Sequence, residues 1–197
     1  MDNDVPPSSP GGHAAGEHTP VADRTAADTR RRVLAAAVEA MRHQPDPSGG
    51  IYFTVLLDRL PMLATALYGL AERAGTRTVT ANLREAAEAA MVFYGDALAA
   101  CAAAFHSPAD VVALRHALLG NDLGPHRSHE PVADYLATER DLGRIDPGVD
   151  PMSGARLLLG GCLNHALVEL LMGDGAVPAR TADAEYLIAG LRLDSAP

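Results

Sequence analysis

The feature that most constrains the fold is an apolar side chain at every third or fourth position between residues 81 and 105. The residues with this spacing are Leu83, Ala87, Met91, Tyr94, Leu98, Cys101 and Phe105. Because an α-helix turns once in about 3.6 residues, these positions share one face, and so long a face needs other helices to cover it. The pattern therefore predicts a long central helix in an all-helical protein.

Other parts of the chain have the same spacing or carry helix boundary signals. Residues 107–110 read Ser-Pro-Ala-Asp, which is a capping box with proline in the first turn. Pro61 is expected either to bend its helix or to restart it, and no segment alternates apolar and polar residues as a strand would. The predicted helices are residues 29–43, 51–74, 81–105, 108–120, 130–142, 151–172 and 181–193. The sequence therefore predicts an all-α protein, an antiparallel helical bundle of about seven helices.

Composition agrees with helix packing and limits the classes of function. The 197 residues are 48% hydrophobic and only 4% aromatic, which favours one sizeable helical core. The net charge of -9 argues against a broad nucleic-acid-binding surface, because such a surface needs clustered positive charge. The two cysteines make no disulfide framework, and no signal sequence or membrane span is evident. We therefore expect a cytoplasmic protein with no membrane partner.

The chain divides into three parts by composition. Residues 1–27 are rich in Pro, Gly, Ser and acidic residues, which predicts a disordered tail. Residues 28–50 hold the first helix, with Asp28 as its expected N-cap, and then a Pro/Gly-rich loop. Residues 51–197 hold the remaining helices and form the predicted body of the protein.

Three stretches resemble the tetracycline-repressor (TetR) family of regulators. Residues 137–173 resemble that family's C-terminal half, residues 81–98 its long central helix and residues 29–41 its first helix. The turn residues that carry the resemblance are Gly143, Arg144, Ile145, Pro147, Val149, Asp150 and Pro151. The same residues would also suit a well-made loop in any helical bundle. The resemblance implies a TetR-like C-terminal domain that binds a small apolar or amphipathic molecule.

The resemblance breaks down where the family reads DNA. A helix-turn-helix there needs two more helices, about thirty residues, after the first one. Here only residues 43–50 (HQPDPSGG) separate the first helix from an apolar run whose single cation is Arg59. The sequence therefore predicts a truncated N-terminal helix-turn-helix that has lost base readout.

Three consecutive cations, Arg30, Arg31 and Arg32, begin the first predicted helix. In the resembled family, residues at this place touch DNA phosphates, and phosphate contact alone gives only non-specific binding. A solvated charge run that opposes the helix dipole accounts for them as well. DNA binding by this chain is therefore doubtful.

The resemblance also implies a ligand cavity beside the long helix. Apolar side chains with polar tips suit such a cavity, although ordinary core packing is the alternative for each of them. The predicted ligand-binding residues are Tyr68, Met91, Tyr94, Cys101, Phe105, Tyr135, Asn164 and His165. Asn164 and His165 interrupt an apolar helix, so we expect them to bond a neighbouring helix, a dimer partner or the ligand.

No catalytic or cofactor motif stands out in the sequence. His126, His129 and Glu130 are metal-ligand types, but their spacing is loose and no cysteine is near them. Cys101 has no base beside it in sequence, which favours an inert thiol over a nucleophile. The sequence contains no P-loop, dinucleotide fingerprint or nucleophile elbow. It therefore predicts neither metal nor cofactor, indicates no catalytic residue and favours a binding protein over an enzyme.

A homodimer through residues 151–173 and 181–193 is the assembly that the resemblance implies. Gly160 and Gly161 would allow close helix contact there, or within one subunit. The function predicted first is a TetR-like regulatory protein that binds a small apolar ligand. The alternatives are a TetR-fold enzyme or carrier that acts on a small apolar metabolite without DNA binding, and a helical interaction module with no ligand.

The apolar run 51–57 needs a partner, because such residues left in water invite aggregation. We predict that residues 51–74 lie along the long-helix face that bears Met91, Tyr94, Leu98 and Cys101. This segment would close one end of the cavity, with Gly49 and Gly50 as its hinge.

Overall fold

The computed structural model describes residues 28, 47–105, 107–124 and 126–194. These residues form α-helices and connecting turns with no strand among them, so the predicted all-α class is confirmed. The helices are α2 (Pro47–Arg73), α3 (Val79–Ala104), α4 (Pro108–Gly120), α5 (His126–Asp141), α6 (Pro151–Met172) and α7 (Arg180–Gly190), with a short 3-10 helix η1 (Asp174–Ala176). The predicted first helix, residues 29–43, lies outside the described residues, and Arg30, Arg31 and Arg32 lie there too.

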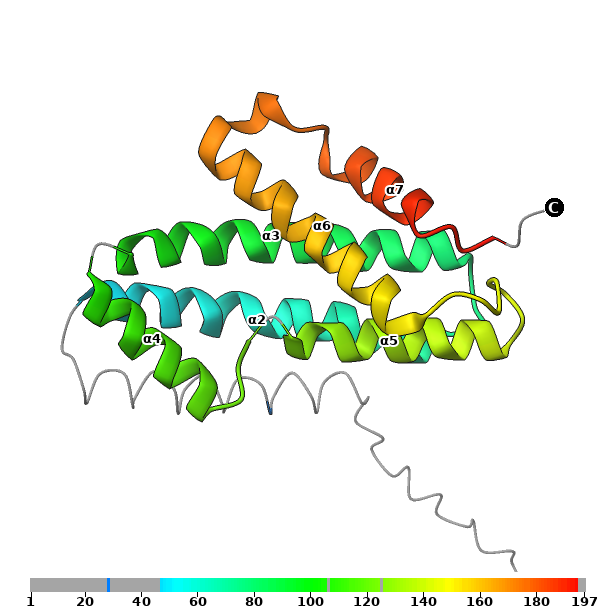
Figure 1. Ribbon diagram of the computed structural model, residues 1–197, viewed down its shortest axis with the longest axis horizontal. Helices are drawn as coiled ribbons and strands as arrows, with labels where there is room; N and C mark the ends of the chain where they lie inside the picture. The colour runs from blue at the N-terminus through cyan, green and yellow to red at the C-terminus, as the bar shows by residue number, and fades with distance from the viewer. Residues whose placement is uncertain (1–27, 29–46, 106, 125, 195–197) are drawn as a thin grey trace, which may run out of the picture.

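Helix α3 is the centre of the bundle. It runs beside α2, and α6 crosses it on another side with α7 alongside (Figure 1). Helix α5 packs against α2 and α6, and the core takes residues from α2, α3, α5, α6 and α7, together with Ala117 of α4. The α3 face predicted from the sequence is buried: Leu83, Ala87 and Met91 are all fully inaccessible. Buried alanines on α3 leave room for the neighbouring helices to pack against it.

The boundaries of two helices differ from the predicted ones. Helix α2 begins at Pro47 and not at residue 51, so Gly49 and Gly50 belong to its first turns and do not form the predicted hinge loop. It also continues through Pro61 without a restart. Helix α5 begins at His126, four residues before the predicted start. In both places the helix takes in polar or Pro/Gly-containing residues that have no apolar periodicity of their own.

A buried polar network joins the α2–α3 turn to α5. The Asn82 amide donates to the Tyr135 hydroxyl at 3.0 Å and to the Thr76 carbonyl at 3.1 Å. One carboxylate oxygen of Glu139 accepts the backbone N–H of Gly75 at 3.2 Å. Burial raises the pKa of Tyr135 to about 12, so its hydroxyl stays neutral and serves this network. Tyr135 is thereby a structural residue of the bundle.

The turn between α5 and α6 behaves as its sequence predicts. Gly143 has φ +69°, a conformation that favours glycine. Asp150 caps α6, since its carboxylate accepts the Ser153 backbone N–H at 2.7 Å, and Pro151 follows in the first turn. These features explain the turn by helix capping alone.

Substitution of Asp150 with Asn should make the free energy of unfolding less sensitive to acidic pH. The hydrogen bonds from Ser153 hold the pKa of Asp150 below its usual range. A lowered folded-state pKa stabilises the protein at neutral pH, and this contribution disappears as the pH falls through that pKa, below about pH 4. Asn caps a helix without titrating. The stability difference between wild type and variant in urea unfolding should therefore shrink from pH 7 to pH 3, and an unchanged difference would contradict the assignment.

Two described helices are long and apolar enough to cross a membrane, judged by length and composition only. They are Thr54–Arg73 within α2, and α6. No such segment was expected from the sequence. Both helices also pack in the bundle, α2 against α3 and α5, and α6 against α3 and α5. The apolar outer side of α6 is considered below.

Candidate functional site

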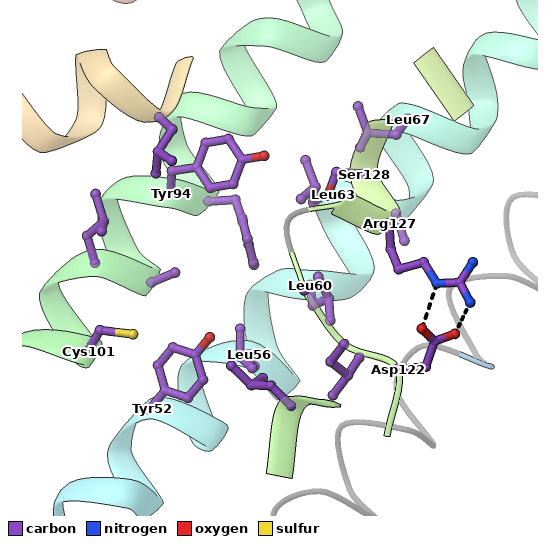
Figure 2. A pocket seen from close by; sticks show the side chains of 18 of the residues that line it. Tyr52, Leu56, Leu60, Leu63, Leu67, Tyr94, Cys101, Asp122, Arg127 and Ser128 are labelled. Atoms are coloured by element: carbon purple, nitrogen blue, oxygen red, sulfur yellow. Dashed lines mark hydrogen bonds and ion pairs between the residues drawn. The ribbon is translucent and has the colours of Figure 1, made fainter. Parts of the chain in front are cut away.

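A cavity of about 200 Å³ lies between α2, α3 and the segment that joins α4 to α5 (Figure 2). One face of α2 supplies four of the described leucines that line the cavity, because these residues recur at helical spacing. They are Leu56, Leu60, Leu63 and Leu67. The second half of α3 supplies the opposite wall with Phe93, Tyr94, Ala97, Leu98 and Cys101. Leu118, Leu123 and Leu163 complete an interior that is mainly apolar.

This arrangement confirms part of the predicted lid geometry. Helix α2 does lie along the face of α3 that bears Tyr94, Leu98 and Cys101, and together they enclose a cavity. Met91, expected on the same wall, is fully buried in the core and does not line the cavity. The cavity begins only at Phe93, so it occupies the C-terminal half of the predicted face.

Two pairs of neutral polar groups face each other across the apolar interior. All four groups line the cavity, with Tyr52 near Cys101 and Tyr94 near Ser128 (Figure 2). Burial raises the pKa of Tyr94 to about 12 and raises those of Tyr52 and Cys101 as well. Both phenols and the thiol are therefore uncharged at neutral pH. A protonated thiol is a poor nucleophile, so Cys101 fits a lining role better than a catalytic one.

An ion pair stands at one edge of the cavity. Arg127 donates from Nε to Asp122 at 2.9 Å and makes a second, shorter contact with the same carboxylate (Figure 2). The guanidinium also donates to Glu130 at 3.2 Å. Hydrogen bonding to Asp122 raises the pKa of Arg127 further, so the group is always charged. The pair links the residues that follow α4 to the first turn of α5.

Helix α4 is the most loosely held wall of the cavity. Ala117 is its one buried residue, and α3 is the described helix that it touches most. Its Leu118 lines the cavity, whereas Val112 and Leu119 are exposed. Few buried apolar contacts mean a low free energy for local opening. Entry to the cavity is therefore easiest beneath α4.

The cavity brings together three of the predicted ligand residues, which are Tyr68, Tyr94 and Cys101. The other predicted positions lie elsewhere. Phe105 follows the last turn of α3 and is 64% exposed, and Asn164 is exposed on α6. Met91 and Tyr135 are core residues, as described above. Helical spacing indicates which residues share a face of a helix, but not which residues of that face line a cavity.

His165 is buried and bonded within the bundle. Its Nδ1 lies 2.8 Å from a carboxylate oxygen of Asp183, which ties α6 to α7. The interhelical bond is one of the roles expected for this histidine. His165 is not among the residues that line the cavity.

Several lining residues were not predicted. The leucines of α2 had a usable signal, because they recur at helical spacing in the segment predicted to close the cavity. Asp122, Arg127 and Ser128 had none, since the α4–α5 loop and the first turn of α5, which hold them, have no apolar periodicity. Within the described ranges, no group of three or more His, Cys, Asp or Glu side chains could hold a metal ion, the segment around His126 and His129 included.

Comparisons with known proteins add no assignment. No protein-family model matches the chain, and neither a curated protein nor a solved structure was found to be similar to it.

Proposed function

We propose that the protein is a TetR-like regulatory protein that binds a small apolar or amphipathic molecule between α2 and α3, and that it no longer reads DNA bases by itself. The observation that carries this proposal is the leucine-lined cavity with its few neutral polar groups. Cavities of this kind, mainly apolar with a small number of polar groups, suit small organic ligands. The resemblance of residues 81–98 and 137–173 to the family supports the regulatory role.

The uncharged phenols and thiol of the lining favour binding over reaction. The phenols of Tyr52 and Tyr94 and the thiol of Cys101 have raised pKa values, so none is poised as a base or nucleophile at neutral pH. A carrier for a small apolar metabolite would use the same cavity in the same way. The carrier is therefore the second candidate function, and the two differ in whether a second macromolecule responds to the ligand.

A DNA-binding experiment separates these candidates. The protein alone should not retard the promoter DNA next to its own gene in a salt-resistant, sequence-specific manner, because the net charge is -9 and base-reading helices are not evident in the sequence. Specific retardation by the protein alone would contradict the loss of base readout. Ligand-dependent retardation in the presence of a partner protein would support the regulator over the carrier.

Replacement of Tyr94 with Ala should weaken the binding of a small neutral fluorescent dye by about 1 kcal/mol or more, roughly fivefold in the dissociation constant. The Tyr94 ring is one wall of the cavity, and its removal takes away contact area from the ligand. Fluorescence titration of the purified protein measures the change.

Phe105→Ala is the matched control for that experiment. Phe105 is an aromatic residue of the same predicted face, but it lies outside the cavity and is exposed. Its removal should leave dye binding within about twofold of wild type. Equal losses in both variants, or no loss for Tyr94→Ala, would mean that the dye does not occupy the cavity.

A further inference from the structure

We propose that the ligand of this cavity is a small uncharged molecule with a hydrogen-bond acceptor, such as a ketone oxygen, and that the acceptor binds at the Tyr94–Ser128 hydroxyl pair. This inference rests on the proposed function, since it concerns the same cavity. It adds the size, the charge and the polar group of the ligand.

The volume of the cavity limits the size of the ligand. An apolar cavity of about 150 Å³ holds benzene. The cavity here is about 200 Å³, is not fully enclosed and is lined on one side by Leu118 of the loosely packed α4. Scaling from that comparison gives a ligand with about eight non-hydrogen atoms inside the cavity, and the opening to solvent leaves room for a few more.

The lining disfavours a charged ligand, and an anion most of all. Among the described lining residues, the only charged side chains are Asp122 and Arg127, and each already neutralises the other. Glu130 adds a second carboxylate to the same guanidinium. A ligand anion would have to displace Asp122 against this negative charge or lose its hydration among leucines, and both are unfavourable. An uncharged ligand meets neither obstacle.

The polar group expected on the ligand follows from the hydroxyl hydrogens that the lining can donate. Tyr94 and Ser128 both line the cavity and carry two hydroxyl hydrogens between them, of which a bond between the two hydroxyls would use only one. The other remains to donate, and the Tyr94 side chain extends from α3 into the cavity (Figure 2). At the other polar pair, one of the partners is the Cys101 thiol, which is a weak donor. The cavity therefore offers its stronger donor at Tyr94–Ser128, and a ligand oxygen that accepts it is preferred to a hydrocarbon.

Three ligands with one ring system test this inference by titration calorimetry on the full-length protein near pH 7.5. They are naphthalene, 2-acetylnaphthalene and 2-naphthoate, of which the last two have nearly the same shape but differ in charge. We expect 2-acetylnaphthalene to bind at least about tenfold more tightly than 2-naphthoate, since the carboxylate must be desolvated. Naphthalene should bind with intermediate affinity.

Two variants locate the acceptor. Tyr94→Phe and Ser128→Ala should each weaken the binding of 2-acetylnaphthalene by about three- to tenfold, the usual effect of one lost hydrogen bond, and change naphthalene binding by less than about twofold. Tyr186→Phe is the matched control, because Tyr186 is 70% exposed on α7 and outside the cavity. It should change neither affinity.

The possible failures are distinguishable. Naphthoate that binds as tightly as the ketone would overturn the requirement for an uncharged ligand. Equal losses of naphthalene and ketone affinity in Tyr94→Phe and Ser128→Ala would overturn the hydrogen-bonding role of the pair. In both of these cases naphthalene still binds, so the proposed ligand-binding function stands. If none of the three compounds binds, the proposed function fails and the inference fails with it.

Discussion

Replacement of Arg144 with Ala should lower the free energy of unfolding by about 3 kcal/mol, and the melting temperature by roughly 6–12 °C. Arg144 lies 3.1 Å from one carboxylate oxygen of Glu139 and donates to the other at 3.4 Å. The Glu139 side chain is completely buried, whereas Arg144 is partly exposed. Removal of the guanidinium leaves a buried carboxylate without the cation that pairs with it, and an uncompensated buried charge is strongly destabilising.

Two further variants make this prediction specific. Arg84→Ala breaks an exposed pair with Glu185, which has a similar separation of 3.1 Å, and should cost less than about 1 kcal/mol. Addition of Glu139→Gln to Arg144→Ala removes the buried charge and should recover part of the lost stability. Urea unfolding at neutral pH measures all three. A loss for Arg144→Ala no larger than that for Arg84→Ala would show that Glu139 does not depend on its partner.

The role of Glu139 could not be predicted from the sequence. It stands in ATERDLGR, residues 137–144, which reads as a solvated stretch of mixed charge at the end of a helix. Its burial depends on the α2–α3 turn, which lies 64 positions away in sequence and presents the Gly75 N–H to it. A pattern in one segment contains no information on which distant backbone group will meet it.

The helices and the main walls of the cavity could be predicted, because both follow from periodicity. Spacing of three and four residues placed Tyr94, Leu98 and Cys101 on one face, and the apolar excess of residues 51–74 required a partner such as that face. The polar edge could not be predicted in the same way. Asp122 and Arg127 meet through the turn between α4 and α5, where the geometry is set by the loop and not by a repeat. The predicted start of α5 was wrong for the same reason.

The outer side of α6 bears apolar residues that the described part of the chain leaves uncovered. Leu157, Leu167 and Leu171 are 65%, 41% and 70% exposed, and they follow one another at near-helical spacing with exposed Asn164 between them. On α7, Tyr186 is 70% exposed. An apolar stripe with a polar residue at its centre is typical of a helix contact in which that residue fixes the register. We therefore propose a second copy of the chain as the cover, through α6 and α7, as the family resemblance implies.

Introduction of Glu at both Leu157 and Leu171 should convert the proposed dimer into a monomer. Each protomer would then bring two carboxylates into an apolar contact, and the symmetry of a homodimer doubles that number. Unpaired charges there should raise the dissociation constant by a factor of at least about 100. Light scattering at micromolar concentration should show twice 20.5 kDa for wild type and 20.5 kDa for the variant.

The matched control places the same charges on another exposed apolar surface. Val112 and Leu119 on α4 are 46% and 66% exposed, and Glu at both should leave the dimer intact. A wild-type protein that remains at 20.5 kDa, or a control that dissociates as readily as the α6 variant, would contradict the proposed interface.

Light scattering in a mild detergent tests the other possible cover, since α6 is long and apolar enough to enter a membrane. Both lipid and the apolar face of another helix can cover exposed leucines. If the protein is monodisperse only as a detergent complex, lipid and not a second copy covers Leu157 and Leu171.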